Sequence, residues 1–152
     1  MSKEKEALTI PNYQVLPLVK FLEAENLSGK VSRSRTKFIQ LIADRIKELE
    51  EERLKICEKF SEKKKVKGEE VIVYIGKDGK DTTVAEGSNF KIKDIEGFNK
   101  EYVAIMSENF IFDILPSTTD LIKDIKNVVL NTSTQFKGPD AAVYNQLCEI
   151  FE

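Results

Sequence analysis

The sequence contains no histidine, no tryptophan and only two cysteines in 152 residues. Without histidine, the chain lacks the commonest general base, the commonest neutral metal ligand and the partner that activates serine or cysteine nucleophiles. Cys57 and Cys148 each lie in an apolar helical pattern, so we expect reduced, buried thiols, with a disulfide as the less favoured alternative. The sequence shows no set of four residues spaced to bind zinc. The sequence therefore predicts no catalytic residues, no metal and no cofactor.

Long apolar runs and an excess of one charge are also missing. No segment approaches the ~20 apolar residues of a membrane span, and residues 1–14 lack the apolar core of a signal peptide. The formal net charge of −2 creates no general attraction to nucleic acid or to an anionic membrane. These features predict a cytoplasmic protein that does not bind membranes, with the virion as an alternative location.

The most regular pattern is a long, charged, amphipathic helix over residues 32–60. Its apolar stripe recurs at spacings of three, four or seven, through Ile39, Ile42, Ile46, Leu49, Ile56 and Phe60. Arg53 occupies a position in this stripe where another apolar residue is expected. Ser32 is expected to cap the helix, and a basic turn over residues 62–68 is expected to end it.

Shorter elements of both kinds are predicted around this helix. We expect further helices to begin at Asn12, Asp94, Ser117 and Pro139. Extended segments are expected at residues 7–10, 71–75, 82–84, 90–92, 110–115 and 131–137. The predicted fold class is α+β, with the long helix packed against three or four shorter helices and a small antiparallel hairpin or sheet. We expect one domain over residues 1–152, with its weakest joint near 62–68.

Positive charges at the start of the long helix oppose the helix dipole. They come from Lys30, Arg33, Arg35 and Lys37. One interpretation is an anion site for a phosphate, a nucleic-acid backbone or an acidic partner. The other is that the arginines pair with nearby carboxylates such as Glu23 or Glu25. Pattern alone leaves both interpretations open.

A recognition surface is the preferred functional hypothesis, because no group of unlike catalytic side chains is evident. The predicted contacts to a partner protein are Lys30, Arg33, Arg35, Lys37 and Arg53. Nucleic-acid binding is the alternative, and it would add Lys63, Lys64, Lys65 and Lys67. The Ile/Leu stripe of the long helix is also compatible with an antiparallel homodimer.

Three stretches of the sequence resemble those of a known protein family. They are LSGKVSRSRTKFIQLI with the following ELEEERLKICEKF, the central FNKEY, and the C-terminal FKGPDAAVYNQLCEIFE. In these motifs the chain resembles a family of small proteins from tailed phages and prophages of Gram-positive bacteria. The resemblance implies a viral origin and an accessory role without a known mechanism. The expected partner is a virion component or a host factor, including a defence system to be inhibited.

Overall fold

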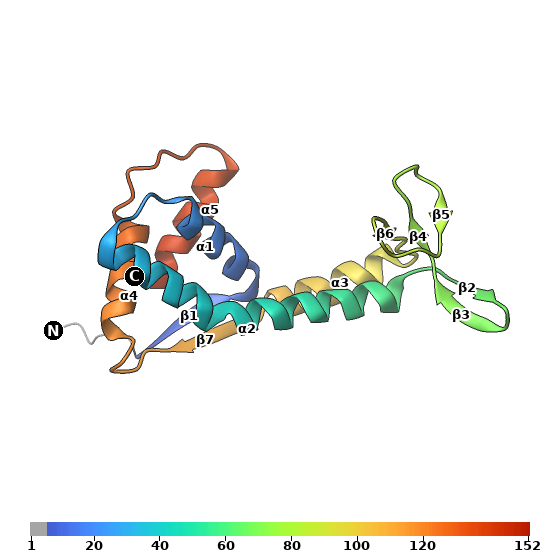
Figure 1. Cartoon of the computed structure of the whole chain (residues 1–152), viewed down its shortest axis with the longest axis horizontal. Coiled ribbons are helices and arrows are strands. Elements are labelled where there is room, and N and C mark those ends of the chain that lie inside the picture. The colour runs from blue at the N-terminus through green and yellow to red at the C-terminus, as the bar shows by residue number, and fades with distance from the viewer. Residues whose placement is uncertain (1–5) are drawn as a thin grey trace. The chain divides into compact units, whose positions relative to one another are not determined.

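The computed structural model describes residues 6–152 and has the predicted α+β fold. Its helices are α1 (Asn12–Ala24), α2 (Gly29–Phe60), α3 (Ile95–Met106), α4 (Thr119–Leu130) and α5 (Pro139–Phe151) (Figure 1). Its strands are β1 (Ala7–Pro11), β2 (Lys63–Val66), β3 (Glu69–Ile72), β4 (Tyr74–Ile75), β5 (Asp81–Thr82), β6 (Asn89–Phe90) and β7 (Asn109–Asp113). The strands form three small antiparallel sheets, ordered β1–β7, β2–β3 and β5–β4–β6. None of the helices in residues 6–152 combines the length and apolar content that a bilayer crossing needs.

The chain divides into two compact units, each of which contains part of α2. Unit 1 comprises the chain up to Lys47 together with residues 106–152, and unit 2 comprises Glu48–Ile105. The unit boundaries thus fall within α2 and at the end of α3. The joint near residues 62–68 stays a prediction. That the whole chain folds as a single domain stays a prediction.

Unit 1 contains most of the apolar core. Of the nineteen buried apolar side chains in the described chain, sixteen belong to this unit. In Figure 1, α1, α4 and α5 gather around the first half of α2, beside the β1–β7 sheet. Alternation along β1 and β7 turns Leu8, Ile10 and Phe112 inward, while Ile111 faces outward and is exposed. The sheet and the four helical segments therefore share one interior.

Unit 2 buries far fewer apolar side chains than unit 1. Its only buried apolar side chains are Ile56, Cys57 and Val73. No residue of α3 is fully buried, although the half-buried rings of Phe98 and Tyr102 stack with centroids 5.7 Å apart. Because few buried apolar side chains hold it together, we expect unit 2 to have the lower local stability of the two.

The long helix starts earlier than expected, and α1 begins at Asn12. The long helix begins at Gly29, three residues before Ser32, because Gly29 adopts a φ of +58° that directs the chain from α1 into α2. Asn12 does not cap α1 but is its first residue, and its buried amide oxygen accepts a hydrogen bond from Arg45 at 2.8 Å. The stripe of α2 is also displaced at its start, where Phe38 is fully buried and Ile39 only half-buried.

Three predictions about extended structure need correction. Residues 63–66 form β2 instead of a basic turn, because Lys67 and Gly68 have the two positive φ values of a type I′ hairpin turn. The predicted strand 71–75 is divided between β3 and β4, which belong to different sheets. Residues 131–137 form no strand; Phe136 instead stacks on Tyr144, with ring centroids 4.5 Å apart.

The predicted start of α3 is confirmed. Asp94 Oδ1 accepts a hydrogen bond from the Gly97 amide at 2.9 Å, as an N-cap side chain does. Gly97 also allows α3 to approach the end of α2, since a Cβ atom there would lie 2.7 Å from Cε1 of Phe60 and would also contact the Asp94 carboxylate. The absence of a side chain at Gly97 is therefore a packing requirement of unit 2.

We expect Gly97→Ala to destabilise unit 2. Overpacking costs about 1–3 kcal/mol, which exceeds the ~1 kcal/mol that alanine gains over glycine in a helix. Amide hydrogen exchange in α3 should accelerate in this variant. Asn99→Ala, at an exposed position of the same helix, is the matched control and should leave exchange unchanged. Equal exchange in both variants would contradict the packing role of Gly97.

Tyr144 fixes the segment between α4 and α5. Its hydroxyl donates a hydrogen bond to the carbonyl oxygen of Val129 at 2.6 Å, and its ring also packs against Phe21. Hydrogen bonding with the Cys148 side chain, followed by burial, raises the pKa of Tyr144 to about 12. The fold therefore favours the neutral phenol.

This pKa predicts a pH dependence of stability. Tyrosine in the unfolded chain has a pKa of about 10. The stabilisation from Tyr144 is therefore complete below pH 10 and is lost as the pH rises toward 12. In an alkaline titration followed by phenolate absorbance, the folded protein should show a late step near pH 12, and Tyr144→Phe should remove that step. A late step that survives in the variant would refute the assignment.

Candidate functional site

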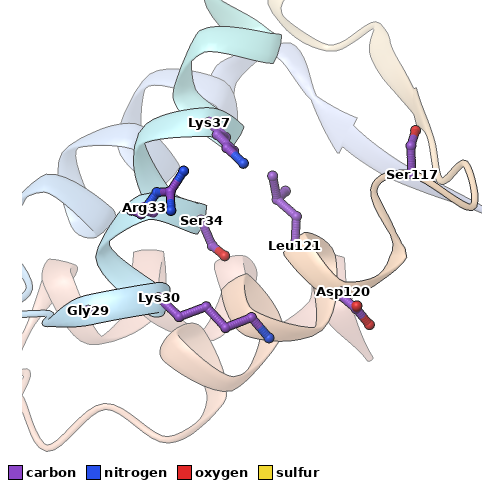
Figure 2. Close-up of a pocket in the computed structure, with 8 residues that line it drawn as sticks. All are labelled: Gly29, Lys30, Arg33, Ser34, Lys37, Ser117, Asp120 and Leu121. Atoms are coloured by element: carbon purple, nitrogen blue, oxygen red, sulfur yellow. The ribbon is translucent and has the colours of Figure 1, made fainter.

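The start of α2 and the start of α4 line an open hollow in unit 1, with a volume of about 490 Å³ (Figure 2). We call it the cationic hollow. It is lined by Gly29, Lys30, Arg33, Ser34, Lys37, Ser117, Asp120 and Leu121. Three of the five residues predicted to contact a partner protein therefore lie together at one site.

The helical repeat of α2 places the three cations on one wall of the hollow. Lys30, Arg33 and Lys37 occupy positions i, i+3 and i+7, which share one face of a helix. With a rise of ~1.5 Å per residue, they span about 10 Å along the helix axis. Figure 2 shows Lys30 and Lys37 extending from α2 toward the start of α4.

Among residues 6–152, only Lys30 of these three cations lies within 4 Å of a carboxylate oxygen. Lys30 Nζ lies 3.8 Å from Oδ2 of Asp124, and the same oxygen accepts a hydrogen bond from Ser34 Oγ at 2.6 Å. The Lys30 side chain is 74% exposed, so this ion pair is weak. Within residues 6–152, Arg33 and Lys37 form no ion pair or side-chain hydrogen bond. The α2 wall therefore carries positive charge that the described chain does not neutralise.

The opposite wall has mixed chemistry. Asp120 supplies a carboxylate, Ser117 a hydroxyl and Leu121 an aliphatic surface. These residues surround the first turn of α4, where the leading N–H groups of a helix lack intrahelical partners. The hollow thus combines cations, hydrogen-bonding groups and one apolar contact.

Arg35 lies outside the hollow and has a structural role. Its guanidinium donates hydrogen bonds to the carbonyl oxygens of Leu22, at 3.0 Å, and Glu25, at 2.6 Å. These carbonyls lie at the C-terminal end of α1, where a positive charge favours the helix dipole. The arginine therefore pairs with backbone carbonyls, and not with the Glu23 or Glu25 carboxylates that the sequence suggested.

Arg53 lies in unit 2 and is paired within its own helix. Its guanidinium donates two hydrogen bonds to the Glu50 carboxylate, at 3.0 and 2.6 Å. Hydrogen bonding to Glu50 raises the pKa of Arg53, and the same bond lowers the pKa of Glu50. Burial raises the pKa of the nearby Cys57 thiol, which lies 3.7 Å from Arg53, so the reactive thiolate is disfavoured. Both groups fit a structural role.

The four lysines proposed for nucleic-acid binding belong to the β2–β3 hairpin of unit 2. Lys63, Lys64 and Lys65 are exposed residues of β2, and Lys67 lies in the turn. Lys65 faces Glu70 across the strand pair. This acidic neighbour reduces the positive charge of the hairpin.

The residues of the second wall were not predicted as part of a site. Ser117 was predicted as a helix start, which placed α4 close to its observed beginning. No local signal in the sequence connects them with Lys37, because the proximity depends on tertiary packing. In residues 6–152, no cluster of three or more His, Cys, Asp or Glu side chains is arranged to hold a metal ion.

Arg35 and Arg33 should respond differently to truncation. Arg35→Ala leaves the last carbonyls of α1 without their charged donor and should lower the free energy of unfolding by about 1–3 kcal/mol. Arg33→Ala, two residues earlier on the same helix, should change it by no more than about 0.5 kcal/mol. Urea denaturation measures both variants. Equal destabilisation would show that Arg35 does not hold the end of α1.

The chain matches no protein-family model, no curated protein sequence and no solved structure.

Proposed function

We propose that this protein is a phage or prophage accessory protein that acts without catalysis, by binding another protein through the cationic hollow. The observation that carries the proposal is the pair Arg33 and Lys37, whose charges are not neutralised within the described chain and line an open hollow. A cation that folding leaves unpaired is available to an acidic group of a partner. The partner class is a virion component or a host factor, such as a defence system, in the host cytoplasm.

The phage origin is supported by the resemblance of the chain's motifs to small phage and prophage proteins. The first of those motifs, residues 27–42, also contains all three cations of the hollow. A binding role agrees with the absence of histidine from the sequence. The resemblance and the hollow thus support one proposal from different directions.

Nucleic-acid binding is the second candidate, and the β2–β3 hairpin is the observation that favours it. A two-stranded ribbon fits the major groove of DNA, and β2 exposes three consecutive lysines. Two features weigh against it: Glu70 faces Lys65 in the hairpin, and the whole chain has a net charge of −2. Protein binding through the hollow remains the better supported function.

Charge reversal in the hollow should abolish binding of the partner protein. The full chain would be used to capture proteins from nuclease-treated lysates of infected Gram-positive cells, which excludes capture through nucleic acid. Arg33→Glu/Lys37→Glu should lose specific partners that the original protein retains, because two attractions become repulsions. Mass spectrometry identifies the captured proteins.

A matched control has the same change in net charge elsewhere on α2. Lys47→Glu/Lys55→Glu alters two exposed lysines of that helix that lie outside the hollow. This control should capture the same partners as the original protein. The proposal fails if all three proteins capture the same set, or if nuclease treatment alone removes the partners.

A further inference from the structure

We infer that the ligand of the cationic hollow is an acidic polypeptide segment that presents carboxylates to α2 and a hydrogen-bond donor to Asp120. This inference rests on the proposed function, because it specifies the chemistry of the partner that the hollow binds. Its argument depends on the two different walls of the hollow, and not on positive charge alone.

The α2 wall matches a row of carboxylates. Arg33 and Lys37 are four positions apart in α2 and are therefore separated by about 6 Å along the helix axis. Carboxylates four apart on a helix have the same separation, and alternate side chains of an extended segment are ~6.6 Å apart. Arg33 offers the planar fork that binds a carboxylate through two parallel hydrogen bonds. Two acidic residues of one segment, four positions apart in a helix or two apart in an extended chain, therefore suffice to reach both cations.

The α4 wall disfavours a ligand that carries only negative charge. Asp120 lines the hollow opposite the cations, and Asp124 follows one turn later on the same helix. A phosphate chain presents only acceptor oxygens at its charged surface, so it would be repelled by Asp120. A polypeptide carries amide N–H donors beside its acidic side chains, and it can also contact Leu121 through apolar atoms. The mixed lining therefore favours an acidic polypeptide over a ligand that offers only phosphate oxygens.

The size of the hollow agrees with this ligand. Its volume of about 490 Å³ lies within the range of roughly 300–1,000 Å³ that is usual for binding pockets. It is open to solvent, so a continuous segment can lie along α2 and place only some of its side chains inside. The hollow is therefore suited to a short stretch of a larger partner.

The inference is tested with defined probes and the full chain. The probes are a glutamate-rich helical peptide, the same peptide with every glutamate replaced by glutamine, a single-stranded DNA oligonucleotide of similar length, and inorganic phosphate. Binding is followed by NMR through the backbone amides of residues 29–37 and 117–121. The glutamate peptide should shift both groups of amides, whereas the glutamine peptide should shift neither. Raised salt should weaken the binding.

Three variants separate the two walls. Arg33→Glu/Lys37→Glu should lower the affinity for the glutamate peptide about tenfold or more. Lys47→Glu/Lys55→Glu should leave that affinity unchanged. Asp120→Asn removes the acidic charge of the second wall. It should therefore increase the affinity for the oligonucleotide relative to the peptide.

Each contrary outcome overturns the inference. An oligonucleotide that binds the original protein at these amides as tightly as the glutamate peptide would identify a nucleic-acid site. Phosphate that produces the same shifts at similar concentration would identify a simple oxyanion site. No shift with any probe would show that the hollow binds no anion. Loss of partners on charge reversal in the capture experiment, without peptide binding here, would refute this inference and leave the proposed function standing.

Discussion

The contact between Arg35 and the end of α1 is the constraint on which the site depends. The chain turns at Gly29, where the positive φ places the last carbonyls of α1 beside the second turn of α2. Arg35 donates hydrogen bonds to those carbonyls. The Glu25 carboxylate accepts hydrogen bonds from the hydroxyls of Thr132 and Thr134. One residue at the end of α1 thus connects the long helix with the segment that precedes α5.

This junction explains an electrostatic conflict in the sequence. Four cations near one helix N-terminus oppose the dipole of that helix. Arg35 satisfies the dipole of the preceding helix, and Lys30 lies near Asp124. Arg33 and Lys37 have no such compensation among the described residues. Folding therefore compensates the charges of Arg35 and Lys30. Arg33 and Lys37 define the charged surface that is available to a partner.

The sequence predicts best the features that depend on neighbouring residues. Helical periodicity located α2, and Asp94 identified the start of α3. It predicts less well the features that depend on distant pairing. The lysines of β2 have low strand propensity, and only the pairing with β3 makes them extended. The same limit applies to the hollow, whose two walls come from segments at least 80 residues apart in the sequence.

The uneven burial along the chain has an evolutionary consequence. Substitutions in unit 1 meet a shared interior of sixteen apolar side chains, so most changes of shape there are costly. Unit 2 has only three such positions, and most of its surface faces water. Selection for folding alone therefore constrains the two units to different degrees. Among descendants of this chain, sequence drift should accumulate fastest between Glu48 and Ile105, while the framework around Arg35 changes slowly.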